Sequence, residues 1–315
     1  MVRKSYSSED ICNEGERLIP FLSHDDSETI RHLSSHSFFK KIITKDAEQL
    51  NLKNISLLDL GFGTGYASFM YANIDQVASV KSIDVSEDLL SWAKDNYYNK
   101  KISYEICDAK EFLQKSKPFE YILTRHVLEH IEDGLNVIQA DNFTKRLCIN
   151  VPYNEKKGNP YHILTGITEK DFPNYESLEF FYEDLKGNTY SRNPKNIFIN
   201  SIICIASKKG MTKVGDNFVF PMKAPTVGQM FSELSHNNFN FVENILSIQR
   251  NKIKSMQEKV NAYDSIEIER SKLLNEVTAL HREYNNTRNE LADIYNSKRW
   301  KYSSKIAEVK NIIRK

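Results

Sequence analysis

A glycine-rich turn between a short apolar run and a segment of helical period constrains the fold of this chain more than any other feature. The stretch reads LLDLGFGTGYAS over residues 57–68, with glycines at positions 61, 63 and 65. Gly61 allows a tight turn with positive φ, and Gly63 lets the backbone come within contact distance of a ligand. Gly65 lets the next helix begin close under the sheet. The pattern predicts a strand–loop–helix unit that binds a nucleoside-containing cofactor at the carboxyl end of the strand.

Three acidic residues accompany the loop, each near the end of a predicted strand. Asp84 lies about twenty residues further on, where a carboxylate can accept both ribose hydroxyls. Asp108 is placed to accept from an adenine amino group. Asp59 lies just before the first glycine, where a carboxylate would repel a pyrophosphate but suits the amino group of S-adenosylmethionine. Because the spacing is G-x-G-x-G rather than the dinucleotide G-x-G-x-x-G, we expect S-adenosylmethionine as the cofactor.

Short apolar runs between about residues 55 and 207 alternate with segments of helical period. Runs of this kind are typical of a parallel sheet with helices on both faces. One helical segment follows Ser86, an N-cap candidate, with Leu89, Leu90 and Ala93 at helical spacing. The last run, within NPKNIFINSIICIAS, is long enough for an antiparallel closing strand. We therefore predict an α/β, Rossmann-like fold.

Changes in composition divide the chain into four predicted parts. They are a helical cap over 1–50, with a helix around Glu28–Leu50, the cofactor-binding domain over 51–222, a linker over 223–240, and a coiled coil with a basic amphipathic end over 241–315. From about residue 241 there is no Gly or Pro, and apolar residues recur in heptads: Ile266, Leu273, Leu280 and Ile294 on one line, and Tyr263, Val277, Tyr284 and Leu291 on the other, interrupted by Arg270 and Thr287. Such a seam predicts a coiled coil and a homo-oligomer, either dimer or trimer.

On these residues the chain resembles the class I S-adenosylmethionine-dependent methyltransferases over about residues 15–210. The family's first motif is matched by Asp59 and the three glycines, its ribose-binding acid by Asp84, its adenine-contacting position by Asp108, and its fourth motif by YILTRHVLEHIED. The phrases GERLIP and NVPYNEKKGNPYHI are similar to members from bacterial surface-polysaccharide (O-antigen or capsule) gene clusters. The resemblance implies an enzyme that methylates a sugar or sugar-linked group, with a glycan or nucleotide-sugar type of acceptor.

The segment LTRHVLEHIED, residues 123–133, has the H-x-x-E-H spacing of some zinc hydrolases. Those enzymes carry their histidines on a continuous helix, whereas the apolar FEYIL just upstream predicts a strand. The resemblance instead implies that Arg125 and His126 lie beside the methionine part of the cofactor. The resemblance also leaves open the hypothesis of a metal site, because some methyltransferases acting on quinone precursors bind a divalent ion at the positions of His126, Glu129 and His130. The alternative is that Glu129 and His130 satisfy backbone groups at a helix start.

Methyl transfer to a hydroxyl requires alignment of donor and acceptor, and a base that takes the proton. The candidates are His126, His130 and His162, in that order, because an imidazole pKa of about 6.5 suits the role. We expect Tyr153 and His162 to form part of the acceptor wall, with an ordinary loop as the alternative. No residue distinguishes oxygen, nitrogen and carbon acceptors. A small-molecule O- or N-methyltransferase outside glycan synthesis, and a cofactor-binding scaffold that acts through its coiled coil, remain alternatives.

Charge and cysteine content limit the partners and the cellular compartment that we expect. Lys and Arg (43) nearly balance Asp and Glu (42), so nothing global argues for a nucleic-acid partner. Four widely spaced cysteines without a C-x-x-C pair fit a reducing compartment. The start lacks an apolar signal-peptide region and no run is long enough to span a bilayer, so we expect a cytoplasmic protein.

The end of the chain combines apolar and basic residues. Trp300, Ile306, Val309 and Ile313 stand among basic side chains at positions 298, 299, 301, 305, 310, 314 and 315. A basic amphipathic helix can lie on an anionic membrane, here the inner membrane face, or dock to a glycosyltransferase. The alternative is a solvated end of the coiled coil.

Overall fold

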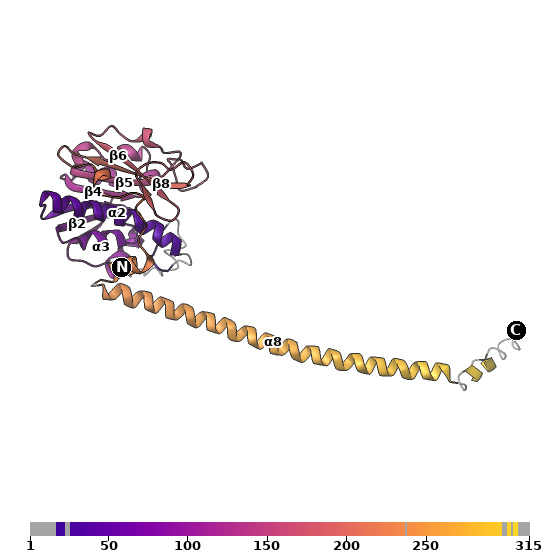
Figure 1. The fold of residues 1–315 in the computed structure, drawn as a ribbon. Helices are drawn as coiled ribbons and strands as arrows, with labels where there is room; N and C mark the ends of the chain where they lie inside the picture. The colour runs from indigo at the N-terminus through magenta and orange to yellow at the C-terminus, as the bar shows by residue number, and fades with distance from the viewer. Residues whose placement is uncertain (1–16, 23–25, 237, 298–300, 304, 308–315) are drawn as a thin grey trace. The chain divides into compact units, whose positions relative to one another are not determined.

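The structure is a computed structural model, and it describes residues 17–22, 26–236, 238–297, 301–303 and 305–307. The chain divides into two compact units, Met1–Ser247 and Ile248–Lys315. The first unit is built on one eight-stranded sheet (Figure 1). Its strands are β1 Ile55–Leu60, β2 Val77–Asp84, β3 Ile102–Ile106, β4 Phe119–Arg125, β5 Phe143–Pro152, β6 Leu178–Asp184, β7 Thr189–Tyr190 and β8 Ile199–Ser207.

The strand order is β3-β2-β1-β4-β5-β8-β6-β7. Strands β1 to β5 pair in parallel, and β8 pairs antiparallel with both β5 and β6. The predicted α/β, Rossmann-like fold and the antiparallel direction of β8 are therefore confirmed, but β8 does not close the sheet, because β6 and β7 lie beyond it. Strands β2 and β3 lie on one side of β1, and β4 and β5 lie on the other side. The carboxyl ends of β1, β2 and β4 are therefore neighbours at one edge of the sheet, where ligands of such sheets bind.

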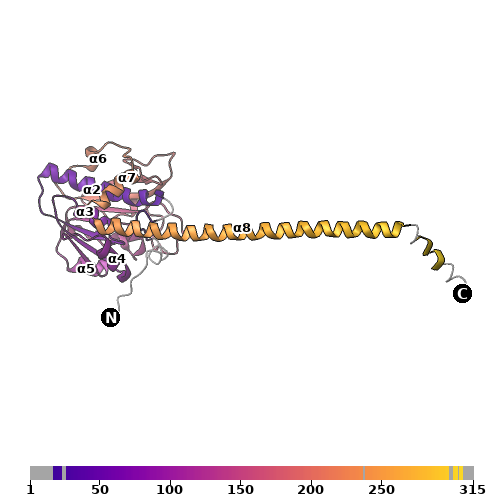
Figure 2. The ribbon, with the colours of Figure 1, turned by 90° about the horizontal axis from the view of Figure 1, so that it is seen from below.

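Helices cover both faces of the sheet. They are α2 Asp26–Leu50, α3 Tyr66–Ala72, α4 Glu87–Asn96, α5 Ala109–Lys115, α6 Val214–Asn217, α7 Val227–Ser235 and α8 Phe239–Asn296, with short 3-10 turns η1 Leu128–His130, η2 Gly134–Asn136, η3 Ala140–Asn142 and η4 Glu169–Asp171. Helices α2, α3 and α7 contact one another on one face (Figure 2). The buried side chains of α5 join the cluster on the opposite face, together with loop residues such as Phe172 and Tyr175.

Alternation along the strands explains why both faces need a cover. In β4, Tyr121 and Leu123 belong to the cluster under α2 and α3, whereas Ile122 belongs to the opposite cluster. Successive strand residues point to opposite faces, so a strand that is apolar at every position must be buried on both. The run YIL within β4 is such a stretch, and the strand ends at Arg125, one residue beyond the predicted end.

A buried ion pair fastens α2 to the sheet. Arg146 of β5 donates to both carboxylate oxygens of Asp46, at 2.7 and 2.8 Å, and Tyr121 donates to the same carboxylate at 3.2 Å. The side-chain exposures of the pair are 0% and 2%. Because the geometry is bidentate, it restricts both the rotation and the position of α2. The other end of α2 is thereby brought to the carboxyl ends of the strands.

One predicted boundary is wrong. Residues 223–240, expected as a linker, contain α7, whose Met230 and Leu234 are fully buried in the core. Phe241 and Ile245, expected in the coiled coil, are also buried there, so the first unit extends to Ser247. Helix α7 is too short for the spacing of its apolar residues to predict which of its faces is buried. The predicted helix around Glu28–Leu50 is confirmed as α2.

The second unit consists, in its described residues, of the rest of α8 and short helical pieces after it. Among the described helices, none is both long and apolar enough to cross a bilayer. Most of the predicted basic end, including Trp300, Val309 and Ile313, lies outside the described residues. Of the cysteines, Cys107, Cys148 and Cys204 are free thiols, and Cys12 lies outside the described residues.

Candidate functional site

The glycine loop adopts the conformation that its spacing predicts. Gly61, Gly63 and Gly65 have φ values of 82°, 53° and 96°. The Gly61 N–H donates to the Ile83 carbonyl at 2.8 Å, and the Gly63 N–H donates to the Asp84 carboxylate at 2.9 Å. These bonds tie the turn after β1 to the end of β2.

The three glycines serve different purposes. A Cβ on Gly61 would lie 2.1 Å from the Val127 side chain, and one on Gly65 would lie 2.8 Å from the Cβ of Ala93. These two positions therefore allow close packing within the protein. A Cβ on Gly63 would meet nothing within 4 Å. Gly63 thus presents bare backbone to open space, which is the arrangement that a ligand-contacting glycine needs.

That open space is a cavity of about 1020 Å³, which we call the loop cavity. Its wall combines the loop with the ends of β2, β3 and β4. Among the residues that line it are Arg17, Leu18, His32, Gly61, Gly63, Tyr66, Asp84, Asp108, Arg125, His126 and His130. Of the seven cofactor-binding residues predicted, Gly61, Gly63, Asp84, Asp108 and Arg125 line this cavity, whereas Asp59 and Gly65 do not.

Asp59 lies beneath the loop rather than in the cavity wall. Its carboxylate is 2% exposed and accepts a hydrogen bond from the Ser68 hydroxyl. Burial raises the pKa of Asp59 to about 7, although the Ser68 hydrogen bond acts in the opposite direction. In this conformation Asp59 holds the start of α3 against β1. Its position in the sequence could not reveal this partner, which lies on the other side of the glycine turn.

Asp84 and Asp108 both line the cavity but have different surroundings. Asp84 accepts from the backbone N–H groups of Gly63 and Ser86, and burial raises the pKa of its carboxyl. Asp108 is the N-cap of α5 and accepts from the N–H groups of Lys110 and Glu111 through one oxygen, Oδ1. An N-cap role accounts for an Asp at this position by itself. The two roles are compatible, because the carboxylate has a second oxygen.

Arg125 is held from α2, a contact that the sequence did not reveal. Its Nε donates to the Ser35 hydroxyl at 2.9 Å, and its Nη1 lies 3.0 Å from Nδ1 of His32. The side chain is buried, and its Nη2 has no hydrogen-bond partner among the described residues. A buried guanidinium N–H at a cavity wall is costly unless a ligand accepts from it. Arg125 is therefore suited to an anionic group in the loop cavity.

His126 occupies a strained position directly after β4. Its φ is 50°, in the left-handed region that non-glycine residues rarely adopt, and its N–H donates to the Asn150 carbonyl at 2.9 Å. The ring Nε2 lies 3.2 Å from the Ser201 hydroxyl, and Nδ1 lies 3.6 Å from the buried Glu129 carboxylate. Burial, followed by the charge of Arg125, lowers the pKa of His126 well below 6.5. The imidazole is thus neutral at pH 7 and able to accept a proton.

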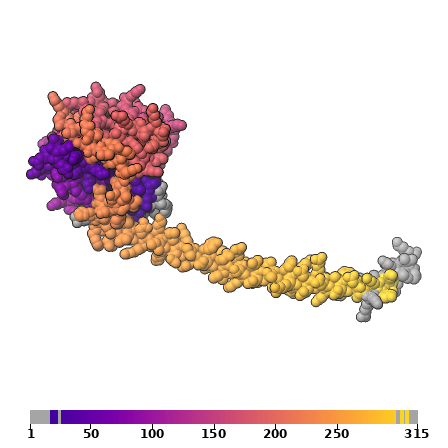
Figure 3. Space-filling view, in the orientation of Figure 1, coloured from indigo at the N-terminus to yellow at the C-terminus, as the bar shows by residue number. Residues whose placement is uncertain are grey.

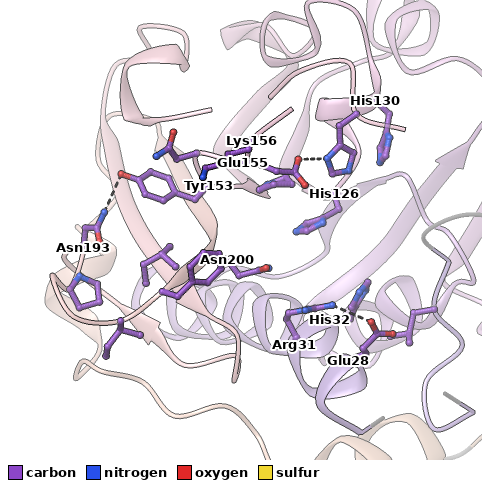
Figure 4. Close-up of a pocket in the computed structure, with 18 of the residues that line it drawn as sticks. Glu28, Arg31, His32, His126, His130, Tyr153, Glu155, Lys156, Asn193 and Asn200 are labelled. Atoms are coloured by element: carbon purple, nitrogen blue, oxygen red, sulfur yellow. Dashed lines mark hydrogen bonds and ion pairs between the residues drawn. The ribbon is translucent and has the colours of Figure 1, made fainter. Parts of the chain in front are cut away.

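A second cavity, of about 1200 Å³, lies on the other side of His126; we call it the histidine cavity (Figure 4). Its wall is mixed: apolar residues such as Ile197 and Phe198 lie beside many polar ones, namely Glu28, Arg31, His32, His126, His130, Tyr153, Asn154, Glu155, Lys156, His162, Asn193 and Asn200. All predicted base and acceptor residues, including Tyr153 and His162, line it. The hydroxyl of Tyr153 accepts from Asn193 at 3.1 Å, and the Nδ1 of His162 pairs with Glu155.

The two cavities meet. Arg17, Leu18, His32, His126 and His130 line both. In Figure 4, His126 lies between His130 on one side and His32 on the other. Arg17 and Leu18 belong to the GERLIP phrase, and the Leu18 carbonyl accepts from the Thr64 hydroxyl of the glycine loop at 2.7 Å. Arg17, Leu18 and His32 were not predicted as site residues, since no local pattern in the sequence connects residues 17–32 to the loop.

A possible metal-binding group differs from the one that the sequence suggested. The side chains of Glu129, His130 and His162 bring ligand atoms within 4.8 Å of one another. His126 is not in this group, so the trio His126, Glu129 and His130 is not supported. His130 directs Nδ1 to the Tyr161 carbonyl at 2.8 Å, and His162 directs Nδ1 to Glu155. The Nε2 of His162 lies 3.3 Å from Nδ2 of Asn159, so a cation there would have to displace that contact.

Comparisons with known proteins bear on the loop cavity. Residues 57–140 match a family described as a methyltransferase domain. The matched segment is similar to that domain. It contains the glycine loop, Asp84, Asp108 and His126, and the cofactor that this domain implies is S-adenosylmethionine. The observed cavity fits that cofactor, because Gly63 offers bare backbone, Asp84 a carboxylate for ribose hydroxyls, and Arg125 an unused buried donor.

Curated relatives of the domain are O-methyltransferases. A mitochondrial ubiquinone biosynthesis O-methyltransferase from Candida albicans is 36% identical over 90 residues, which is 27% of each chain. A malonyl-[acyl-carrier protein] O-methyltransferase from Bacillus anthracis is 25% identical over 118 residues, covering 38% of this chain and 42% of the relative. The crystal structure of WbdD aligns with a TM-score of 0.47 at 11% identity, over 63% of this chain and 46% of that one. The chain thus spans less than half the length of the curated relatives it matches.

Proposed function

We propose that this chain is an S-adenosylmethionine-dependent methyltransferase whose acceptor binds in the histidine cavity. The observation that carries the proposal is that two cavities meet at His126. One has the glycine loop and acids of a methyltransferase domain, and the other is lined by hydrogen-bonding side chains. A transferase needs two adjoining sites, so that donor and acceptor are aligned across a shared boundary.

The residues at the boundary support transfer to a hydroxyl. S-adenosylmethionine, when bound, supplies an electrophilic methyl group. His126 is the base: Nε2 takes the proton of the acceptor hydroxyl, and the methyl carbon would leave the cofactor sulfur as it bonds to the acceptor oxygen. Glu129, 3.6 Å from Nδ1, stabilises the imidazolium that results. The Ser201 hydroxyl, 3.2 Å from Nε2, orients the ring before the acceptor arrives.

The wall of the histidine cavity supports a sugar or sugar-linked acceptor of a bacterial surface glycan. Asn154, Asn193 and Asn200 offer both donors and acceptors, and Glu28 and Glu155 offer further acceptors. A polyhydroxylated acceptor matches such a mixed set better than an apolar ring does, because each buried hydroxyl needs a partner. A small-molecule O- or N-methyltransferase outside glycan synthesis is the alternative within enzymes.

Two measurements test the proposal in sequence. Isothermal titration with S-adenosylhomocysteine should give binding in the micromolar range, and Asp84→Asn should weaken it. No heat at tens of micromolar would refute the cofactor assignment and favour a scaffold that acts through its coiled coil. Methyl-labelled S-adenosylmethionine is then incubated with a panel of nucleotide sugars and with catechols. Label in the sugars supports the glycan proposal, and label only in the catechols favours the alternative.

The setting of the enzyme is part of the proposal. We place it in the cytoplasm, with its basic end docked to the inner membrane face or to a glycosyltransferase, which brings it near growing glycans. Flotation of the full chain with vesicles containing anionic lipid tests the membrane version. A chain that stays at the bottom of the gradient with such vesicles would refute membrane docking. Docking to a glycosyltransferase, or a solvated end, would then remain. Homo-oligomerisation through α8 also belongs to the proposal, and its geometry can be argued further.

A further inference from the structure

Large apolar side chains recur along α8 in the second unit, the orange-to-yellow helix of Figure 3, and are exposed. Eight of these side chains, which we call the stripe, are between 50% and 69% exposed: Tyr263, Ile266, Leu273, Val277, Leu280, Tyr284, Leu291 and Ile294. Exposed apolar surface on this scale marks an interaction site. The helix that carries it is a single 58-residue element, Phe239–Asn296.

The steps along the stripe fix its heptad positions. Tyr263 is followed three residues later by Ile266, and four residues separate Ile266 from position 270. In a heptad, position a precedes d by three residues and d precedes the next a by four. The a positions are therefore 263, 270, 277, 284 and 291, and the d positions are 266, 273, 280, 287 and 294. Two of these ten are polar, Arg270 at a and Thr287 at d.

The heptad assignment also places the charged residues that flank the stripe at g and e positions. The g positions are all acidic over four heptads: Glu269, Glu276, Glu283 and Glu290. The e positions are Glu267, Leu274, His281, Arg288 and Tyr295, so the pairing argument rests on His281 and Arg288. The four g glutamates, His281 and Arg288 are all exposed. A column of one charge at g is informative, because g and e residues decide which orientation two helices adopt.

A parallel, in-register pair brings each g residue next to the e residue five positions later in the second copy. Glu283 then faces Arg288 of the second copy, and Glu276 faces His281. In an antiparallel pair, g faces g, so glutamates would oppose glutamates along the overlap. We propose that residues 263–294 bind a second copy of this chain as a parallel, in-register, two-stranded coiled coil.

The occupant is a second copy because the stripe is complementary to itself. One helix supplies both Glu283 and Arg288, and symmetry makes the same pair twice. Arg270 supports two strands rather than three. At an a position its long side chain can reach the edge of a two-stranded core, where Glu269 of the second copy lies, and its guanidinium already pairs with Glu267 at 2.8 Å. The inference is independent of methyl transfer.

A charge swap in the full chain tests orientation. Glu283→Arg alone, or Arg288→Glu alone, puts like charges together in a parallel pair. Each should raise the dimer dissociation constant about tenfold at low salt, measured by sedimentation at serial dilution. The double variant Glu283→Arg/Arg288→Glu should restore it. In an antiparallel pair Glu283→Arg would relieve repulsion and tighten the dimer, which would overturn the proposal.

Cysteine cross-linking tests register without relying on charge. Leu273→Cys and Ile294→Cys, made separately, should both form disulfide-linked dimers under mild oxidation, because equal positions meet in a parallel, in-register pair. An antiparallel pair can bring at most one of them together. Asn289→Cys, at an outer f position, is the control and should not cross-link. The wild type should sediment at twice the 36.6 kDa chain mass. A mass of one or three chains would overturn the two-stranded pair.

Discussion

Gly63 offers the sharpest test of the cofactor loop, because a methyl group there should affect binding far more than folding. The Cβ of Gly63→Ala would meet no protein atom within 4 Å, so no packing clash is expected. The backbone, at φ 53°, costs an L-residue about 1–2 kcal/mol. Reduced freedom of the unfolded chain returns about 0.4–1 kcal/mol. The net loss of about 1 kcal/mol should lower the melting temperature of a unit of this size by about 2–4 °C.

The affinity of Gly63→Ala for the cofactor should change more than its stability. The new methyl group points into the loop cavity, where the structure leaves room for a ligand to contact the backbone. Forcing an extra methylene into a packed contact costs about 1–3 kcal/mol, which is about a 5- to 150-fold increase in Kd. The assay is isothermal titration with S-adenosylhomocysteine, with thermal denaturation of the same samples.

Gly210→Ala is the matched control. Gly210 has φ 90°, its Cβ would also meet nothing within 4 Å, and it lines neither cavity. It should lower the melting temperature about as much as Gly63→Ala and leave the Kd unchanged. Gly65→Ala, whose Cβ would lie 2.8 Å from that of Ala93, should instead destabilise the fold more strongly. Equal Kd values for wild type and Gly63→Ala would refute the placement of the cofactor against this loop.

Four further outcomes are expected. His126→Asn keeps a residue that tolerates positive φ but removes the base, so kcat should fall about 10²- to 10⁴-fold, and a loss below tenfold would contradict the assignment. Because burial holds the pKa of His126 below 6.5 and the neutral ring is the base, the wild-type rate should persist from pH 7 to below 6.5 and fall only as the ring protonates at lower pH; an acid limb centred above 6.5 would contradict this. Asp46→Ala leaves the Arg146 charge buried and should cost about 3–5 kcal/mol in urea denaturation, whereas Asp46→Leu/Arg146→Met should recover much of the loss. EDTA, followed by Mg²⁺ or Mn²⁺, should leave the transfer rate unchanged; a rate that falls and then returns would assign a cation to Glu129, His130 and His162.

The loop and its acids were predictable because their signals are local. A strand, a glycine turn and a helix follow one another within residues 57–72, and positive φ is a property that glycine reveals in the sequence. Parallel strands end at the same edge of a sheet, so Asp84, Asp108 and His126 could be expected together once the strands were identified. The strand before His126 likewise excluded the helical zinc-hydrolase interpretation of HVLEH.

The errors and omissions concern contacts between segments far apart in the chain. Asp59 was expected to suit the amino group of the cofactor, and the sequence did not reveal that its carboxylate accepts a hydrogen bond from Ser68 beneath the loop. The segment 223–240 was expected as a linker, but Met230 and Leu234 find their apolar partners on α2 and α3. His162, rather than His126, completes the group with Glu129 and His130. In each case the side chain's partner, and not its own type, decides its role.

The amino-acid sequence by itself determined the kind of fold and the place of the cofactor loop, since periodicity and glycine spacing act through neighbouring residues. It also carries the heptads and the glutamate column of α8, whose orientation argument needs only position along a helix. Only the tertiary structure decided how the loop cavity meets a second cavity at His126. That meeting depends on the buried Arg146–Asp46 pair, which holds α2 so that His32 and Ser35 reach Arg125. Bonds across a hundred residues leave no periodic trace in the sequence, because the fold alone brings their partners together.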